Sequence, residues 1–181
     1  MGEISDEEIV QLVLKGNKEK YGELISRYEE KLRRYASRVI NRSDEVVEDV
    51  VEDALVEGYI RLASFDQRRK FSGWIYRIVH NKAVDWIRKN WWRGVVTSEE
   101  NRSNEDIETK AIIDQEKREL ARAIRKLERE ERELVTLAYF EEKSYEEIGE
   151  ILHLSKSAVG VKLYRIKKKL KRDLRIKFYD L

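Results

Sequence analysis

Residues Phe65 to Arg93 read FDQRRKFSGWIYRIVHNKAVDWIRKNWWR. From Phe71 onward, apolar side chains recur at three- and four-residue spacing, which predicts a helix with one buried face. The opposite face carries guanidinium groups, rings and an amide, which suits nucleic acid because guanidinium groups pair with phosphates and rings stack on unpaired bases. The polar residues just before this helix, Ser64 to Lys70, are predicted to form a loop between two helices.

The composition of the 181-residue chain favours an all-α fold. It contains no proline and eight glycines, 41% of its residues are charged, and few segments alternate between apolar and polar residues. These features give little indication of β-strands or hairpins. Cysteine is absent, the N-terminus is acidic, and no apolar run reaches the roughly 20 residues that span a bilayer. We therefore expect a cytoplasmic protein that does not enter the membrane.

The net charge of +2 hides a strong segregation of charge along the chain. Residues 1–60 carry 9 basic and 15 acidic side chains, and residues 94–155 carry 10 and 17. By contrast, residues 61–93 carry 9 basic and 2 acidic side chains, and residues 156–177 carry 10 and 1. Two basic segments separated by an acidic one predict two distinct contacts with a polyanion.

The first half of the chain is predicted to hold three more helices. Ser5 and Glu8 form a capping box that starts a short helix, and apolar residues then define long helices over residues 21–39 and 44–63. The outer face of the third helix is unusual because apolar residues lie there among carboxylates: Asp49, Glu52, Asp53, Val56 and Ile60. We interpret this face as a protein-docking surface for a basic partner. A metal site is disfavoured because neither histidine belongs to a recognisable ligand set.

Beyond Arg93 the sequence is polar and lacks apolar periodicity until about residue 112, which predicts a flexible linker over residues 94–111. Domains are therefore expected at 1–93 and 112–181. In the second, Ser144 and Glu147 form a capping box for a short helix, His153 lies in a tight turn, and Ser155 starts a longer basic helix. This is a helix-turn-helix whose second helix is shaped for the major groove. Its outer face carries Ser157, Val161, Tyr164, Arg165 and Lys168.

Two blocks of sequence resemble the sigma factors of bacterial RNA polymerase in the extracytoplasmic-function group. Residues 48–55 with 71–85 are similar to sigma region 2, and residues 139–152 with Ser155, Val159, Leu163 and Arg165 are similar to region 4. The resemblance implies a protein that binds core RNA polymerase, recognises the −10 and −35 promoter elements and promotes DNA opening, with no catalytic residue, metal or cofactor of its own. An anti-sigma protein is a further partner that the family allows.

The resemblance also implies roles for individual residues. The acid-rimmed face of the third helix would bind the polymerase, and the loop before the central helix would capture a base flipped from the non-template strand of the −10 element. The −35 duplex would be read by Ser157, Val161, Tyr164, Arg165 and Lys168. Single-stranded −10 DNA would be bound by Phe65, Gln67, Arg68, Phe71, Arg77, Asn81 and Arg88.

Two positions depart from the family pattern. Members commonly have Leu-Pro where this chain has Leu127 and Glu128, and Lys where it has Gly160. Two other functions remain as alternatives: a free-standing helix-turn-helix regulator, which leaves the acid-rimmed face unexplained, and an enzyme, which lacks a nucleophile-and-base set and a glycine-rich phosphate loop. Promoter sequence and activating signal do not follow from the sequence.

Overall fold

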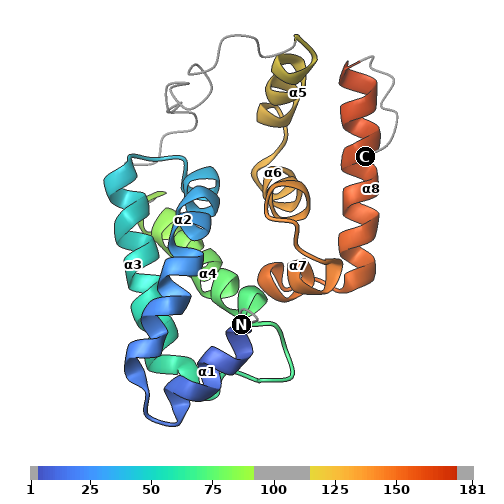
Figure 1. Cartoon of the computed structure of the whole chain (residues 1–181). Helices are drawn as coiled ribbons and strands as arrows, with labels where there is room; N and C mark the ends of the chain where they lie inside the picture. The colour runs from blue at the N-terminus through green and yellow to red at the C-terminus, as the bar shows by residue number, and fades with distance from the viewer. Residues whose placement is uncertain (1–3, 92–114, 175–181) are drawn as a thin grey trace.

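The computed structural model describes residues 4–91 and 115–174, and every regular element in those two ranges is helical (Figure 1). The all-α prediction is thereby confirmed. The first range holds α1 (Asp6–Leu14), α2 (Tyr21–Ile40), α3 (Asp44–Arg61) and α4 (Phe71–Trp91). The second holds α5 (Gln115–Arg125), α6 (Arg129–Val135), α7 (Tyr145–Leu152) and α8 (Lys156–Leu174), with a π-helical turn at Thr136–Phe140 extending α6. The predicted linker, residues 94–111, lies outside the described residues.

Local hydrogen bonds and backbone conformation mark where α1 begins, where α2 ends and where α4 begins. The capping box predicted for α1 is present: the Ser5 hydroxyl accepts from the backbone N–H of Glu8, and the Glu8 carboxylate accepts from the N–H of Ser5. α2 ends at Asn41, which adopts the left-handed conformation with φ 53° that asparagine tolerates. Glu7 accepts from the backbone N–H of Phe71 at 2.9 Å, so α1 supplies a carboxylate to the positive N-terminus of α4.

An aromatic cluster joins α2 and α4 beneath the loop that separates α3 from α4. The ring of Phe71 lies 5.5 Å from that of Tyr28 and 5.8 Å from that of Phe65, in edge-on arrangements, and Phe65 also packs against Trp74 at 5.4 Å. Edge-to-face pairs of this kind stabilise a core beyond the area they bury. Phe65 and Phe71, at the two ends of the loop before α4, thus pack in the core and support the loop.

The helix-turn-helix predicted in the second half is confirmed. The Ser144 capping box starts α7, and His153 lies in the predicted turn, where it adopts the left-handed conformation with φ 56°. The N–H of Leu154 then donates to the carbonyl of Gly149 at 2.9 Å, and the hydroxyl of Ser155 accepts from the N–H of Ala158 at the start of α8. α8 buries its predicted inner face, including Val159, Leu163 and Ile166.

α6 begins without the proline that the family commonly has there. Glu128 nevertheless has φ −61°, close to the angle that a proline ring imposes, and its extended ψ of 156° is that of an N-cap residue. Its backbone N–H, which proline would lack, donates to the carboxylate of Glu131 at 3.1 Å. A hydrogen bond therefore replaces the ring constraint at this position.

The two described ranges pack directly on each other. α7 lies against α4, and α6 with its π-helical turn lies against α2 (Figure 1). Buried side chains form one continuous cluster that runs from α1–α4 into α6–α8. The sequence predicted two domains, and no local motif in it marked this contact.

We expect Gly149→Ala to destabilise the helix-turn-helix. An added Cβ would lie 2.5 Å from the backbone oxygen of Leu154, which cannot move without opening the turn, so the free energy of unfolding should fall by about 1–3 kcal/mol. Gly22→Ala in α2 is the matched control, because its Cβ would meet nothing within 4 Å. Helix propensity should make that variant up to about 1 kcal/mol more stable. Urea denaturation measures both, and equal stability of the two variants would contradict the steric argument.

Candidate nucleic-acid and protein interfaces

The face of α3 interpreted as a docking surface is fully available in the structure. All five of its residues are exposed, and the two apolar ones strongly so, with 59% of Val56 and 72% of Ile60 accessible. The helix turns its other face, including Val47, Val51 and Leu55, into the core. Exposed aliphatic side chains among carboxylates fit a partner that offers apolar contacts within a basic surface.

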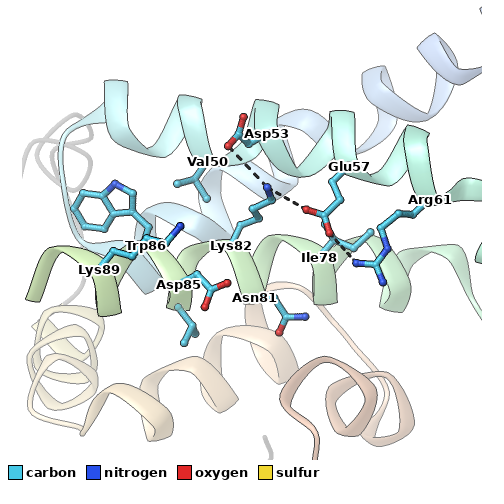
Figure 2. A pocket seen from close by; sticks show the side chains of 11 residues that line it. Val50, Asp53, Glu57, Arg61, Ile78, Asn81, Lys82, Asp85, Trp86 and Lys89 are labelled. Carbon is cyan, nitrogen blue, oxygen red and sulfur yellow. Dashed lines mark hydrogen bonds and ion pairs between the residues drawn. The ribbon is translucent and has the colours of Figure 1, made fainter.

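A groove of about 490 Å³ lies between α3 and α4, next to this face (Figure 2). Lys82 reaches across it from α4, with its ammonium 3.0 Å from the Glu57 carboxylate and 3.9 Å from that of Asp53. Hydrogen bonds from Arg61 and Lys82 lower the pKa of Glu57. Asn81, predicted to contact DNA, is exposed and lines the same groove. Lys82 thus ties the candidate docking helix to the candidate DNA-binding helix, a role that no local sequence signal indicated.

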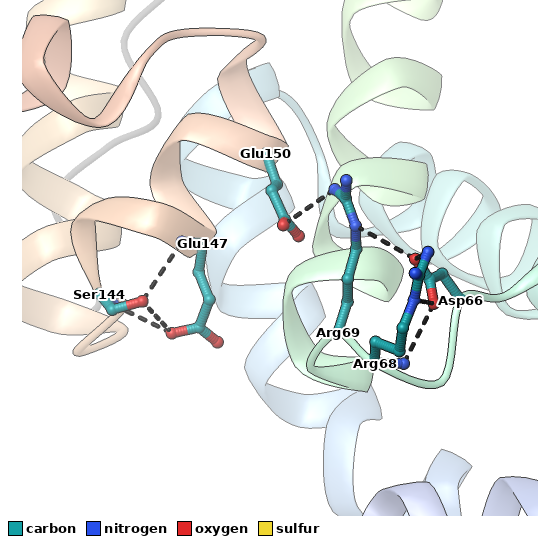
Figure 3. Close-up of polar contacts among 6 residues, drawn as sticks. All are labelled: Asp66, Arg68, Arg69, Ser144, Glu147 and Glu150. Carbon is teal, nitrogen blue, oxygen red and sulfur yellow. Dashed lines mark hydrogen bonds and ion pairs between the residues drawn. The ribbon is translucent and has the colours of Figure 1, made fainter.

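The loop between α3 and α4 presents a guanidinium group held in place by a carboxylate. Arg68 donates twice to Asp66, from Nε and Nη2, each at 2.9 Å, and its backbone N–H donates to the same carboxylate at 3.1 Å (Figure 3). These hydrogen bonds lower the pKa of Asp66 to about 2. Gln67 and Arg68 are both exposed. Arg68 is thus held in a defined position beside Gln67, and the predicted contact of these two side chains with a base stays a prediction.

Two residues predicted to contact −10 DNA lie elsewhere. Phe65 and Phe71 are 5% and 1% exposed and belong to the aromatic cluster under the loop. The physical reason is that an aromatic residue at each end of a short polar loop packs beneath it, where burial gains more than exposure. Their role in this structure is to support the loop, and the prediction that their rings face DNA is corrected accordingly.

The other candidates on α4 lie along its outer face. Arg88 is exposed and Arg77 is partly buried. Arg88 donates to Asp85 at 2.9 Å, one turn away, in a solvent-exposed pair of the kind that contributes little to stability and can be exchanged for a phosphate.

The residues of α8 that were predicted to read DNA are exposed to solvent. Ser157, Val161, Tyr164, Arg165 and Lys168 are all exposed, although Val161 and Tyr164 are large and apolar. The Lys168 ammonium lies 5.1 Å from the centroid of the Tyr164 ring, in a cation–π arrangement. At Gly160 the space that a side chain would enter is bordered by the Tyr145 ring, 3.5 Å from a hypothetical Cβ.

A set of contacts between the two halves was missed by sequence reasoning. Carboxylates of α6, its π-helical turn and α7 accept hydrogen bonds from side chains of α2, α4 and the loop before α4. The partners are 65 to 98 residues apart in the sequence, so no local pattern marks them. Among the described residues there is no group of three or more histidine, cysteine, aspartate or glutamate side chains that could hold a metal ion. The same residues include no helix long and apolar enough to cross a membrane.

Comparison with known proteins gives two matches in series along the chain. The family described as Sigma-70 region 2 matches residues 24–93, and the family described as Sigma-70, region 4 matches residues 117–170. The chain is 28% identical to the ECF RNA polymerase sigma factor SigW of Bacillus subtilis over 178 residues, which cover 92% of this chain and 95% of SigW.

Two solved structures resemble this one over most of its length. CnrH in complex with the cytosolic domain of CnrY is 27% identical, has a TM-score of 0.70 and aligns over 94% of this chain and 97% of its own. The sigma factor RpoE of Bartonella quintana, in complex with the anti-sigma factor NepR, is 18% identical with a TM-score of 0.69, over 87% of this chain and 98% of its own. At 18% identity, the similarity to RpoE shows a shared fold.

The burial of the loop's flanking rings leads to a prediction about stability. Phe71→Ala should lower the free energy of unfolding by about 3–5 kcal/mol, because it removes a ring from a packed cluster. Arg68→Ala, three residues away and exposed, should change it by less than about 0.5 kcal/mol. Chemical denaturation of both variants makes the comparison. A Phe71→Ala variant as stable as Arg68→Ala would place that ring at the surface and restore it as a candidate for DNA contact.

Proposed function

We propose a division of labour within this chain, which belongs to the sigma-70 family of bacterial RNA polymerase sigma factors and to its extracytoplasmic-function group. As a sigma factor, it binds core RNA polymerase and directs it to promoters. In our proposal α3 docks on the polymerase, the loop before α4 and α4 itself bind the opened −10 element, and α8 reads the −35 duplex. The observation that carries the proposal is that regions 2 and 4 follow one another in the chain, each with an exposed face whose chemistry suits its partner.

The docking role rests on Asp49, Glu52, Asp53, Val56 and Ile60. Carboxylates around exposed aliphatic side chains combine electrostatic steering with an apolar contact, and steering by charge mainly sets partner choice and association rate. Lys82 of α4 pairs with Glu57 at 3.0 Å and lies 3.9 Å from Asp53, so α3 is tied to α4 beside the docking face.

The −10 role rests on the exposed side chains of Gln67, Arg68, Asn81 and Arg88, and on the partly buried Arg77. A loop that presents an amide and a fixed guanidinium group beside a cationic helix can hold a single strand by its backbone and take up one extruded base. The −35 role rests on the α8 face, where Arg165 and Lys168 supply cations and Val161 and Tyr164 supply apolar contacts for thymine methyl groups.

The remaining partners follow from the family. In our proposal the chain has no active site, because the polymerase supplies the chemistry, and it works in the cytoplasm, where polymerase and promoter are. RpoE of Bartonella quintana is held by an anti-sigma factor, and we propose that a partner of this kind also sequesters this chain. The alternative of a free-standing helix-turn-helix regulator gives no reason for the docking face on α3.

The experiment that tests the proposal as a whole is co-purification with core RNA polymerase, followed by run-off transcription on a library of promoter fragments. We expect a stoichiometric complex and transcripts that depend on the added chain. A chain that binds DNA tightly and specifically without polymerase at physiological salt would favour the free-standing regulator.

The docking surface can be tested by charge reversal. Asp49→Lys combined with Asp53→Lys should abolish polymerase binding while leaving the melting temperature nearly unchanged, because exposed charges contribute little to folding. The matched control is Glu19→Lys with Glu30→Lys, which makes the same charge change at exposed positions outside α3. Polymerase affinity measured by pull-down and biolayer interferometry should fall only for the α3 pair. Equal affinity of the two double variants would remove the docking assignment.

The two DNA contacts should differ in the form of DNA they need. Arg165→Ala with Lys168→Ala should weaken holoenzyme binding to duplex and forked promoters alike, by about 1–3 kcal/mol per groove contact. Gln67→Ala with Arg68→Ala should weaken binding only where a particular non-template base is presented. That penalty should vanish when the nucleotide is abasic. Equal losses for the loop variants on every template, abasic ones included, would mean that the loop holds phosphates and captures no base.

A further inference from the structure

The helix that follows the candidate base-capture loop begins at residues poorly suited to cap it. α4 has no acidic residue in its first turn, and the residue before it is Lys70, whose ammonium group cannot accept a hydrogen bond. α1 and α7, by contrast, each begin with a serine and a glutamate that form a capping box. The first N–H groups of a helix have no partner within the helix, so those of α4 need acceptors from elsewhere.

Glu7 of α1 supplies one of these acceptors. Its Oε1 accepts a hydrogen bond at 2.9 Å from the backbone N–H of Phe71, the first residue of α4. The carboxylate thereby lies at the positive end of the helix, where negative charge is favoured. The two residues are 64 positions apart in the sequence. The family match to region 2 begins at residue 24, so Glu7 and the rest of α1 lie outside it.

The three acidic residues in the first turn of α1 have three different partners. Asp6 binds α2, where the Arg27 guanidinium group lies 2.6 Å away and the Tyr28 hydroxyl donates to the same carboxylate. Glu8 belongs to the capping box of α1 itself. Glu7, between them, is the one that reaches α4. Asp6 therefore anchors α1 to α2, and Glu7 approaches α4 from an anchored helix.

α1 also lies against both ends of the loop that we assign to base capture (Figure 1). It contacts the 3-10 turn at Leu62–Ser64, which leads into the loop, and it contacts α4, which follows the loop. Its inner side chains, among them Ile9 and Val10, are fully buried in the core. Phe71 lies only three residues after Arg68, so the position of its backbone sets where this end of the loop lies.

Two kinds of contact hold Phe71. Its ring belongs to the aromatic cluster, whereas its backbone N–H is held by Glu7. Removing the carboxylate leaves the ring packed, so the fold should persist while the backbone at the end of the loop loses one of its fixed points. Recognition of a base needs Gln67 and Arg68 in one arrangement, and such an arrangement depends on the hydrogen bonds that support it.

We infer that Glu7 is a positioning residue for capture of the −10 base, and that α1 supports the loop of region 2 through it. The inference deepens the proposed function and rests on it, since the loop must take up a base for its position to matter. Glu7 touches no DNA in this assignment. It acts through the Phe71 N–H, which fixes the end of the loop.

Three substitutions at Glu7 separate the hydrogen bond from the charge. Glu7→Gln keeps an oxygen acceptor at the same reach without the charge, Glu7→Asp keeps the charge but is one methylene shorter, and Glu7→Ala removes both. The measurement is holoenzyme affinity for a forked promoter, divided by its affinity for the same template with the captured nucleotide made abasic. That nucleotide is the one whose removal weakens binding most with the unmodified chain.

This affinity ratio should fall about fivefold or more for Glu7→Ala and Glu7→Asp, and it should stay within about twofold for Glu7→Gln. Glu19→Ala, at an exposed position outside α1, is the matched control and should leave the ratio unchanged. Affinity for core polymerase should be the same for all of these variants, because the docking face is on α3.

Hydrogen exchange of the Phe71 amide tests the contact without DNA. Exchange measured by NMR on the full-length protein should be about tenfold faster in Glu7→Ala and Glu7→Asp than in the unmodified chain, and little changed in Glu7→Gln. The urea midpoint of the three variants, measured in parallel, should shift much less than that of Phe71→Ala.

The outcomes separate this inference from the underlying function. A ratio that falls in Glu7→Gln but not in Glu7→Asp would mean that only the charge matters, and equal ratios in all variants would mean that Glu7 does not position the loop. An equal loss of affinity on intact and abasic templates, or variants that fail to fold, would make Glu7 a structural residue. Each of these results would overturn the inference. An unmodified chain that binds intact and abasic templates equally would instead count against base capture in the proposed function.

Discussion

The Glu133 carboxylate, buried between Tyr35 and His80, is the constraint on which the arrangement of the two halves depends. A buried acceptor must keep its hydrogen-bonding partners, and here both partners, the Tyr35 hydroxyl and the His80 ring, belong to the opposite half of the chain. Separation of the halves returns the carboxylate to water, which supplies hydrogen bonds of comparable quality. The penalty for separating the halves is therefore moderate, whereas the penalty for removing one partner while they stay in contact is large.

α4 contributes at once to the core, to the support of the loop and to the contacts with α3 and region 4. Its inner face, with Ile75, Ile78 and Val79, completes the core, while its start rests on the aromatic cluster that supports the loop. Lys82 ties it to the docking helix, and Tyr76 and His80 tie it to region 4. Because these contacts share one helix, any displacement of α4 would disturb the loop, the ion pairs with α3 and the hydrogen bonds with region 4 together.

Sequence reasoning succeeded where the determinant is local. Capping at Ser5 and Ser144, the tight turn at His153 and the periodicity of α8 follow from hydrogen bonds or apolar spacing within a few residues, and each is present. The prediction of DNA contact failed for Phe65 and Phe71. The sequence around an aromatic residue beside a basic loop is the same whether its ring packs in the core or contacts a base. Sequence reasoning also missed the pairing of Tyr35 with Glu133, since a contact across 98 residues leaves no periodic signal.

The segregation of charge along the chain agrees with the contact between the two halves, although it identifies no individual pair. Residues 61–93 are strongly basic and residues 94–155 strongly acidic, so the two segments attract one another. Arg69 illustrates the consequence, because its guanidinium group is paired with the Glu150 carboxylate at 2.9 Å. A phosphate forms charge-assisted hydrogen bonds of similar strength with a guanidinium group, so the cations that suit a nucleic acid also suit the carboxylates of the second half.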